Sequence, residues 1–171
     1  EKILEQFEFT DEVVKQAMRQ ISIAKELKYV RLNLTGIHFR FGDYSGNPYY
    51  ANLIENGYYE AAIKEFCLGY NTVFVVCSDE IQKAKEQVDT FLNDGYGNIW
   101  LISEHKEPIL DLCLLANCQS HIIANSSFSW WAHRLCKYKS KHATAPKKWF
   151  SGAGLANDTK DLFPENAILI K

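Results

Sequence analysis

Residues 72–77 read TVFVVC and give the first indication of the fold. This unbroken apolar run is rich in β-branched residues, as is typical of a strand that is buried on both faces of a parallel sheet. A helical pattern begins at Asp79 and stops at residues 93–95, which read NDG, and an apolar strand follows at residues 98–102. A strand, a helix and a second strand in this order predict the right-handed crossover unit of α/β proteins.

The same alternation continues in both directions from this unit and predicts an α/β fold, a Rossmann-like parallel sheet with helices on both faces. The chain is expected to divide into a helical lead at residues 1–30 and an α/β domain at residues 31–171, in which residues 151–161 form a mobile loop. The other predicted elements are a helix that Asp11 caps and that ends near Lys28, a strand at 34–39, a helix at 58–68 closed by Gly69, a helix at 109–116 after Pro108, a strand at 121–124, a helix at 127–136, a strand at 141–145 stopped by Pro146, and a strand at 167–170.

The composition disfavours several classes of protein. The 171 residues suit a single domain, and 47% hydrophobic residues suffice for its core. With 19 Lys and Arg against 21 Asp and Glu, the net charge of −2 lacks the basic surplus of nucleic-acid-binding proteins. No apolar run reaches the ~18 residues of a membrane span, and residues 1–9 do not resemble a signal peptide. Five cysteines without a Cys-x-x-Cys pair indicate buried free thiols in a reducing compartment.

Polar groups follow three of the predicted strands, at the edge where a doubly wound sheet binds its ligands. These segments are HFRFGD at residues 38–43, CSDE at residues 77–80 and NSSFSWW at residues 125–131. The third segment opens a helix, whose free N–H groups and dipole favour an anion. The guanidinium of Arg40 beside that helix end would complete a clamp for a diphosphate.

Each of these residues also has a simpler interpretation. Arg40 and Asp43 could pair across a surface turn, where an ion pair contributes little to stability. Ser126 could serve only as a helix N-cap, Asp79 is expected to cap its helix in either case, and His38 could be an interior histidine with satisfied hydrogen bonds. The coincidence of three polar segments at one edge of the sheet favours a binding site.

Several standard site motifs are absent from the sequence. No Gly-x-Gly-x-x-Gly follows a strand, no Gly-Lys-Ser/Thr phosphate loop occurs, and no Gly-x-Ser-x-Gly elbow supports a hydrolase. The five histidines lack the spacing of zinc ligands. There is also no Asp-x-Asp to hold a metal ion. A diphosphate leaving group would therefore have to be stabilised by organic cations and a helix end.

Four motifs, in this order and spacing, resemble the α-1,2-fucosyltransferases of glycosyltransferase family 11. They are His38-x-Arg40-x-x-Asp43-Tyr44, then VCSD at residues 76–79, IANSSFSWWA at residues 123–132 and APKKWF at residues 145–150. The NSSFSWW block is the most specific of them. The resemblance covers residues 31–171 and implies the nucleotide-sugar-binding, donor-side half of a GT-B fold. It also implies inverting transfer from GDP-fucose to a hydroxyl of a β-galactoside, with no metal and no cofactor.

The resemblance assigns a role to each site residue. Arg40 matches the arginine that grips the β-phosphate of the donor, and His38 matches a histidine expected to shape the donor site. Asp43 matches an acidic residue that we expect either to act as the general base or to orient Arg40, which makes Arg40 and Asp43 the expected catalytic pair. Asp79 is expected near the guanosine. The residues expected to bind the diphosphate and the nucleotide are Ser126, Ser127, Phe128 and Ser129.

Two departures from the family pattern affect these expectations. The second arginine of the first motif is Phe41 here, so one positive charge near the leaving group is expected to be lost. The Gly-rich motif of an N-terminal domain is absent from the sequence, so the chain is expected to be only the donor-binding half. A fucosyltransferase with another acceptor linkage, a non-catalytic GDP or nucleotide-sugar binding module, and an α/β domain of other function stay open as alternatives. The expected partners are a nucleotide sugar and a glycan acceptor, and the expected location is the cytoplasm rather than the Golgi lumen.

Overall fold

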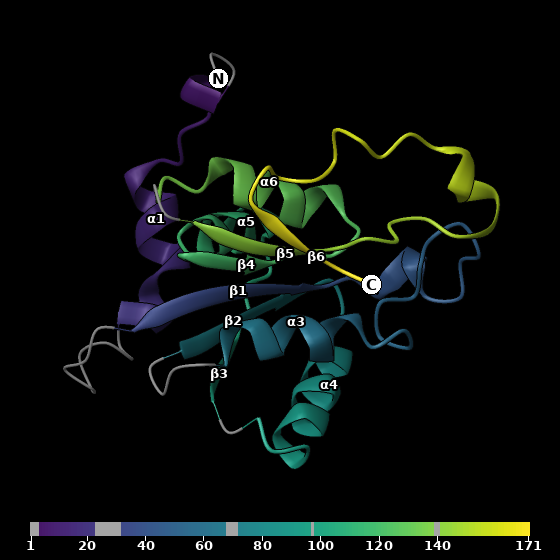
Figure 1. The fold of residues 1–171 in the computed structure, drawn as a ribbon. Helices are drawn as coiled ribbons and strands as arrows, with labels where there is room; N and C mark the ends of the chain where they lie inside the picture. The colour runs from purple at the N-terminus through teal and green to yellow at the C-terminus, as the bar shows by residue number, and fades with distance from the viewer. Residues whose placement is uncertain (1–3, 23–31, 68–71, 97, 139–140) are drawn as a thin grey trace.

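The computed structural model describes residues 4–22, 32–67, 72–96, 98–138 and 141–171. A parallel sheet of six strands forms its centre, in the order β3-β2-β1-β4-β5-β6 (Figure 1). The expected Rossmann-like α/β fold is confirmed. The strands are β1 (Asn33–Phe39), β2 (Thr72–Ser78), β3 (Ile99–Ile102), β4 (Ser120–Ile122), β5 (His142–Pro146) and β6 (Ala167–Ile170).

Helices cover both faces of the sheet (Figure 1). On one face α3 (Tyr58–Phe66) and α4 (Ile81–Asn93) contribute to a core with β1, β2 and β4. The opposite face packs against α1 (Asp11–Ala17), α5 (Pro108–Ala116) and α6 (Ser127–Leu135). Short 3₁₀ helices complete the described structure, η1 (Leu4–Gln6), η2 (Gly42–Tyr44) and η3 (Gly152–Ala156).

The apolar run of β2 supplies both cores at once. Phe74 and Val76 point into the core with α3 and α4, whereas Val73, Val75 and Cys77 point into the core with α1 and α5. Successive side chains of a strand alternate between the two faces of the sheet. When both faces are covered by helices, every side chain of the strand is buried and apolar residues are favoured at every position. This is why the sequence of this strand lacks a polar alternation.

The strand order places a topological switch point at the centre of the sheet. The chain moves outward from β1 through β2 to β3, then returns through α5 to β4 on the other side of β1. In such sheets the crevice at the carboxyl ends of the two strands flanking the switch binds the ligand. Here those strands are β1 and β4, which precede Arg40 and Ser126.

The first predicted helix begins differently from our expectation. Thr10, and not Asp11, is the N-cap of α1, because the Thr10 hydroxyl accepts a hydrogen bond from the N–H of Val13. Asp11 is the first helical residue, where its charge suits the helix dipole. The predicted helix ends near Lys28 and at Gly69 lie outside the described residues. Ala17 of α1 is fully buried against the domain, and the division at residue 30 stays a prediction.

One boundary in the C-terminal part needs correction. Pro146 does not follow the end of β5, as predicted, but is its last residue, where it pairs with Ile170. The loop predicted at residues 151–161 contains η3 and is tied back to an earlier loop. The Ser151 hydroxyl lies 2.8 Å from the carbonyl oxygen of Pro48 and 2.7 Å from that of Tyr50.

The cysteines are free thiols, as predicted, and all but Cys67 are buried. Within the described ranges, no helix is long and apolar enough to cross a membrane.

Candidate functional site

A cleft of about 670 Å³ opens at the carboxyl ends of the strands. Its lining comes from the segments that follow β1, β2, β3 and β4, which are the strands around the switch point. The volume lies within the range of roughly 300–1,000 Å³ that is usual for small-molecule sites. Among the described cavities, this cleft alone combines Arg40 with the start of α6.

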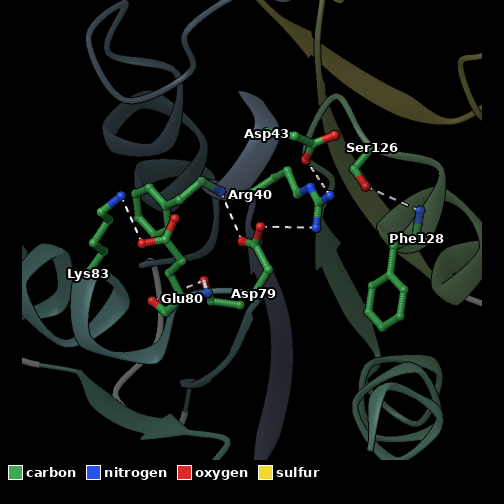
Figure 2. Close-up of polar contacts among 9 residues, drawn as sticks. Arg40, Asp43, Asp79, Glu80, Lys83, Ser126 and Phe128 are labelled. Atoms are coloured by element: carbon green, nitrogen blue, oxygen red, sulfur yellow. Dashed lines mark hydrogen bonds and ion pairs between the residues drawn. The ribbon is translucent and has the colours of Figure 1, made fainter. Parts of the chain in front are cut away.

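Arg40 lies in this cleft and makes two ion pairs. Figure 2 shows its guanidinium between the carboxylates of Asp43 and Asp79, on the side of Ser126. The Nη1 atom is 3.0 Å from Oδ2 of Asp79, and Nη2 contacts Oδ1 of Asp43. The guanidinium carbon also lies 5.3 Å from the centre of the Tyr44 ring. The pair across the turn that the sequence allowed therefore exists, but a second carboxylate from another strand joins it.

Asp79 occupies a different place from the one expected of a helix cap. The N-cap of α4 is Glu80, which makes no side-chain capping bond, and α4 begins at Ile81. The Oδ1 atom of Asp79 instead accepts a hydrogen bond of 2.9 Å from the backbone N–H of Phe41. Asp79 therefore joins the end of β2 to the loop after β1, and the expectation that it caps its helix was wrong.

The third motif forms the opposite wall of the cleft. Ser126 is the N-cap of α6, and its hydroxyl accepts a hydrogen bond of 3.3 Å from the N–H of Phe128 (Figure 2). Ser126, Ser127 and Phe128 all line the cleft together with Arg40. The first N–H groups of a helix have no partner within the helix, and the dipole adds positive potential there. The end of α6 is therefore suited to an anion.

Ser129 does not lie with its three neighbours in the cleft. Its side chain is buried, and its Oγ atom accepts a hydrogen bond of 3.1 Å from the N–H of Ala124. The same hydroxyl lies 3.3 Å from the carbonyl oxygen of Ser126. Ser129 thus fastens the first turn of α6 to the backbone after β4, and, unlike the expected donor-binding set, it is buried and does not line the cleft.

His38 lines the cleft from the end of β1. It is buried, its ring centre is 5.1 Å from that of Phe128, and its Nδ1 atom is without a hydrogen-bond partner among the described residues. Burial, and secondarily the charge of Arg40, lowers the pKa of His38 to about 3. The imidazole is therefore neutral at physiological pH, and its hydrogen bonds are not satisfied as those of an interior histidine would be.

Phe41 does not point into the cleft. Its ring packs beside Phe39, with ring centres 6.0 Å apart, and the ammonium of Lys83 lies 5.9 Å from its centre. Phe41 lies outside β1 as the N-cap of η2, and its ring packs away from the cleft lining. The expected loss of a positive charge at this position stays a prediction.

The cleft also contains residues to which the sequence assigned no role. Tyr44 and Tyr50 stack with ring centres 3.9 Å apart, and His105, Lys106 and Asp111 come from the segment after β3. The pKa of Tyr44 is raised to about 12, chiefly by burial, and the pKa of Asp111 is raised by burial. The sequence did contain a signal for His105, Lys106 and Asp111, because they follow a predicted strand, as the other cleft segments do.

Comparison with known proteins gives a consistent result. The family model for Glycosyl transferase family 11 matches residues 1–160. The chain is 31% identical over 164 residues to the O-antigen biosynthesis glycosyltransferase WbnK of Escherichia coli, which covers 93% of this chain and 53% of that protein. It is 32% identical over 154 residues to an alpha-1,2-colitosyltransferase of Escherichia coli, and this match covers 86% of this chain and 52% of that protein. The chain thus spans about half the length of these relatives.

Proposed function

Because the chain belongs to glycosyltransferase family 11, we propose that it binds the diphosphate of GDP-fucose and contributes to transfer of the fucose to a hydroxyl of a β-galactoside. The transfer forms an α-1,2 linkage with inversion at the anomeric carbon. One observation carries the proposal: Arg40 and the N-terminus of α6 line the same cleft at the switch point. This is the arrangement that a diphosphate requires.

The proposed donor sugar has one close competitor. One relative is named for transfer of colitose, which is fucose without its 3-hydroxyl group. We therefore propose a GDP-linked 6-deoxyhexose as the donor class and GDP-fucose as its first member. Parallel assays with GDP-fucose and GDP-colitose distinguish the two sugars, and linkage analysis of the product identifies the hydroxyl that is substituted.

In the proposed reaction the protein stabilises the departing GDP. The bond between the anomeric carbon and the β-phosphate oxygen breaks, which leaves positive charge on the sugar and negative charge on the phosphate. Arg40 donates hydrogen bonds to the phosphate oxygens, and the start of α6 at Ser127, where the helix dipole is positive, lines the same cleft. Lys106 adds a second positive charge to the cleft. These groups perform the role that a metal ion has in other glycosyltransferases, so we expect EDTA to leave the rate unchanged.

The acceptor hydroxyl attacks the face of the sugar opposite the diphosphate and loses its proton to a carboxylate. Asp43 is half of the expected catalytic pair, and its side chain is 68% exposed and in contact with Arg40. We propose that Asp43 orients Arg40. Replacement of Asp43 by Asn would then lower activity to the same degree at every pH, whereas loss of a general base would also change the pH profile.

The test is the substitution Arg40→Ala in the full-length protein. It removes the central donor to the leaving group, and we expect kcat/KM for GDP-fucose to fall by about 10²–10³, as for loss of one oxyanion donor. Arg40→Lys keeps the charge but not the fork of N–H groups and should recover only part of the loss. Arg19→Ala, at an exposed arginine outside the cleft, is the matched control. Unchanged turnover in Arg40→Ala would contradict the proposed function.

A further inference from the structure

Asp79 uses each of its two oxygen atoms for a different contact with the loop after β1. Oδ2 pairs with Nη1 of Arg40 at 3.0 Å, and Oδ1 accepts the N–H of Phe41 at 2.9 Å (Figure 2). The carboxylate therefore holds both the side chain of Arg40 and the backbone that follows it. Among the described residues, no other carboxylate at the end of a neighbouring strand contacts this loop.

The register of the sheet creates this contact. Phe39 of β1 pairs with Ser78 of β2 as the last pair of the two strands. Arg40 and Asp79 are the next residues on each strand, so they leave the sheet side by side. The position of Asp79 relative to Arg40 is thus determined by the rigid centre of the molecule and not by a loop.

Gly42 leaves the space that the Asp79 carboxylate occupies. A Cβ atom at residue 42 would overlap Oδ2 of Asp79, and the Gly42 backbone has an ordinary negative φ. Glycine is therefore needed at this position because a side chain would clash with Asp79, and not because the backbone adopts a left-handed conformation. A methyl group at this position offers a second way to displace the carboxylate from Arg40.

The two carboxylates that contact Arg40 differ in exposure. The Asp43 side chain is 68% exposed, whereas the Asp79 side chain is 21% exposed. An exposed ion pair within one turn is screened by water and fixes little, whereas a partly buried pair is screened less. Asp79 is accordingly the partner that constrains the orientation of the guanidinium more strongly, and Asp43 adds a weaker constraint from the same turn.

We propose that Asp79 is a positioning residue that holds Arg40 in its productive orientation and makes no contact with the donor itself. The inference rests on the proposed function, in which Arg40 meets the diphosphate. A guanidinium has five N–H groups, of which one on Nη2 donates to Asp43, while Nη1 forms the ion pair with Asp79. Further N–H groups are then left for phosphate oxygens. A carboxylate beside a diphosphate repels it, so the contribution of Asp79 to turnover acts through Arg40.

This assignment gives Asp79→Asn a distinctive signature in the full-length protein. The variant removes a negative charge from the cleft but keeps an oxygen that can accept the N–H of Phe41. We expect GDP to bind as tightly as to the wild type, or more tightly, because the repulsion is gone. We expect kcat with GDP-fucose to fall about tenfold or more, because small misplacement of a catalytic group has effects of this size. Gly42→Ala should show the same separation of binding from turnover.

Three comparisons complete the test. In the Arg40→Ala background, Asp79→Asn should cause no further loss of kcat, since a positioning residue has nothing left to position. Asp158→Asn, at an exposed Asp paired with Lys160 outside the cleft, is the matched control and should be neutral. Melting temperatures of all variants separate these effects from unfolding.

The outcomes distinguish this proposal from the proposed function. Weaker GDP binding caused by Asp79→Asn also in the Arg40→Ala background would show direct contact with the donor, and an unchanged kcat in the single variant would show that Asp79 has no role in turnover. Either result overturns the positioning role. An equal loss of kcat with and without Arg40 would also overturn it. If Arg40→Ala itself leaves GDP binding and turnover intact, the proposed function fails instead.

Discussion

Asn125 shows how a single buried side chain can hold the cleft together. It lies between β4 and α6, and its Nδ2 atom donates hydrogen bonds to the carbonyl oxygens of Ala51, at 2.9 Å, and Trp149, at 3.0 Å. The first carbonyl follows Tyr50 of the cleft wall, and the second follows β5. One amide therefore joins three segments that are far apart in the sequence.

We predict that Asn125→Ala lowers the free energy of unfolding by about 2–4 kcal/mol. The substitution leaves the carbonyl oxygen of Ala51 without this donor, at a cost of about 1–3 kcal/mol, and removes one of the two hydrogen bonds to that of Trp149, at a cost of about 1 kcal/mol. Urea unfolding of the two proteins measures the difference. Asn93→Ala, at the exposed end of α4, removes an amide without a buried partner and should change stability by less than about 0.5 kcal/mol. A loss in Asn125→Ala no greater than that of the control would contradict the prediction.

Residues of the site differ in how far the sequence could place them. The sequence could place Ser126, Ser127 and Phe128 at the start of a helix, because a capping serine and a helical period are recognised within a few neighbouring residues. Asp79 has the same local pattern but a different role. Its partner Arg40 is 39 positions away, and only the pairing of two strands brings them together.

At the scale of elements, α6 is fastened to the sheet by a pair of histidines. Nδ1 of His133 lies 3.1 Å from Nδ1 of His121, and Nε2 of His121 lies 3.0 Å from the carbonyl oxygen of Leu115. A carbonyl only accepts, so Nε2 of His121 carries the hydrogen and its Nδ1 accepts from His133. The ring of His121 must then be neutral. Burial is the main cause that lowers the pKa of His121 to about 4 and that of His133 to about 3.

We predict that this pair makes the protein less stable as the pH falls from 7 to 5. The folded pKa values lie below the value of about 6.5 in the unfolded chain, so the unfolded state binds more protons in this range and stability increases with pH. Each such histidine contributes a slope of up to about 1.4 kcal/mol per pH unit. The full contribution is present above about pH 6.5 and is lost progressively below it.

The measurement is the unfolding free energy of wild type and His133→Gln at several pH values between 5 and 7. Glutamine can still donate to Nδ1 of His121 but does not titrate, so the pH slope should be smaller than that of the wild type. His142→Gln, at an exposed histidine of β5, should keep the wild-type slope. Equal slopes in wild type and His133→Gln would show that the pair does not titrate on unfolding.

The existence of most elements was predictable, but some boundaries were not. The helical period of the apolar residues indicates α4, which buries one face, and the unbroken apolar run indicates β2, which is buried on both faces. The ends of the helices depend on which of several neighbouring side chains forms the capping hydrogen bond. Thr10 caps α1 where Asp11 also could, and Asp79 leaves the start of α4 because Arg40 offers it a charged partner.

At the scale of the whole molecule, the site exists because of the order of the strands. Four consecutive strand ends supply the cleft, and helices on both faces keep the sheet rigid below it. Gly36 in the middle of β1 contributes to this packing, since a Cβ atom there would lie 2.8 Å from Cδ2 of Leu115 in α5. Both covered faces share the central strand β1, which leads directly to Arg40.

We predict that GDP raises the stability of the full-length protein and that guanosine does so much less. A ligand that binds only the folded state stabilises it by about 2.7 kcal/mol at 100 times its Kd. The diphosphate should supply most of this affinity, because Arg40 and the start of α6 face it. Thermal unfolding with GDP, guanosine and UDP measures the effect, and Arg40→Ala should reduce the GDP shift. Equal shifts with GDP and guanosine would contradict a role for the diphosphate.

The amino-acid order alone was enough to indicate an α/β sheet and to mark Arg40 and the segment at residues 125–131 as a diphosphate clamp, because strand burial, helix capping and anion binding at a helix end depend on neighbouring residues. It could not place Asp79 against Arg40, turn Phe41 away from the cleft or bury Ser129. These arrangements depend on strand register and on packing between layers. Both arise from contacts between distant parts of the chain, which only the folded molecule brings together.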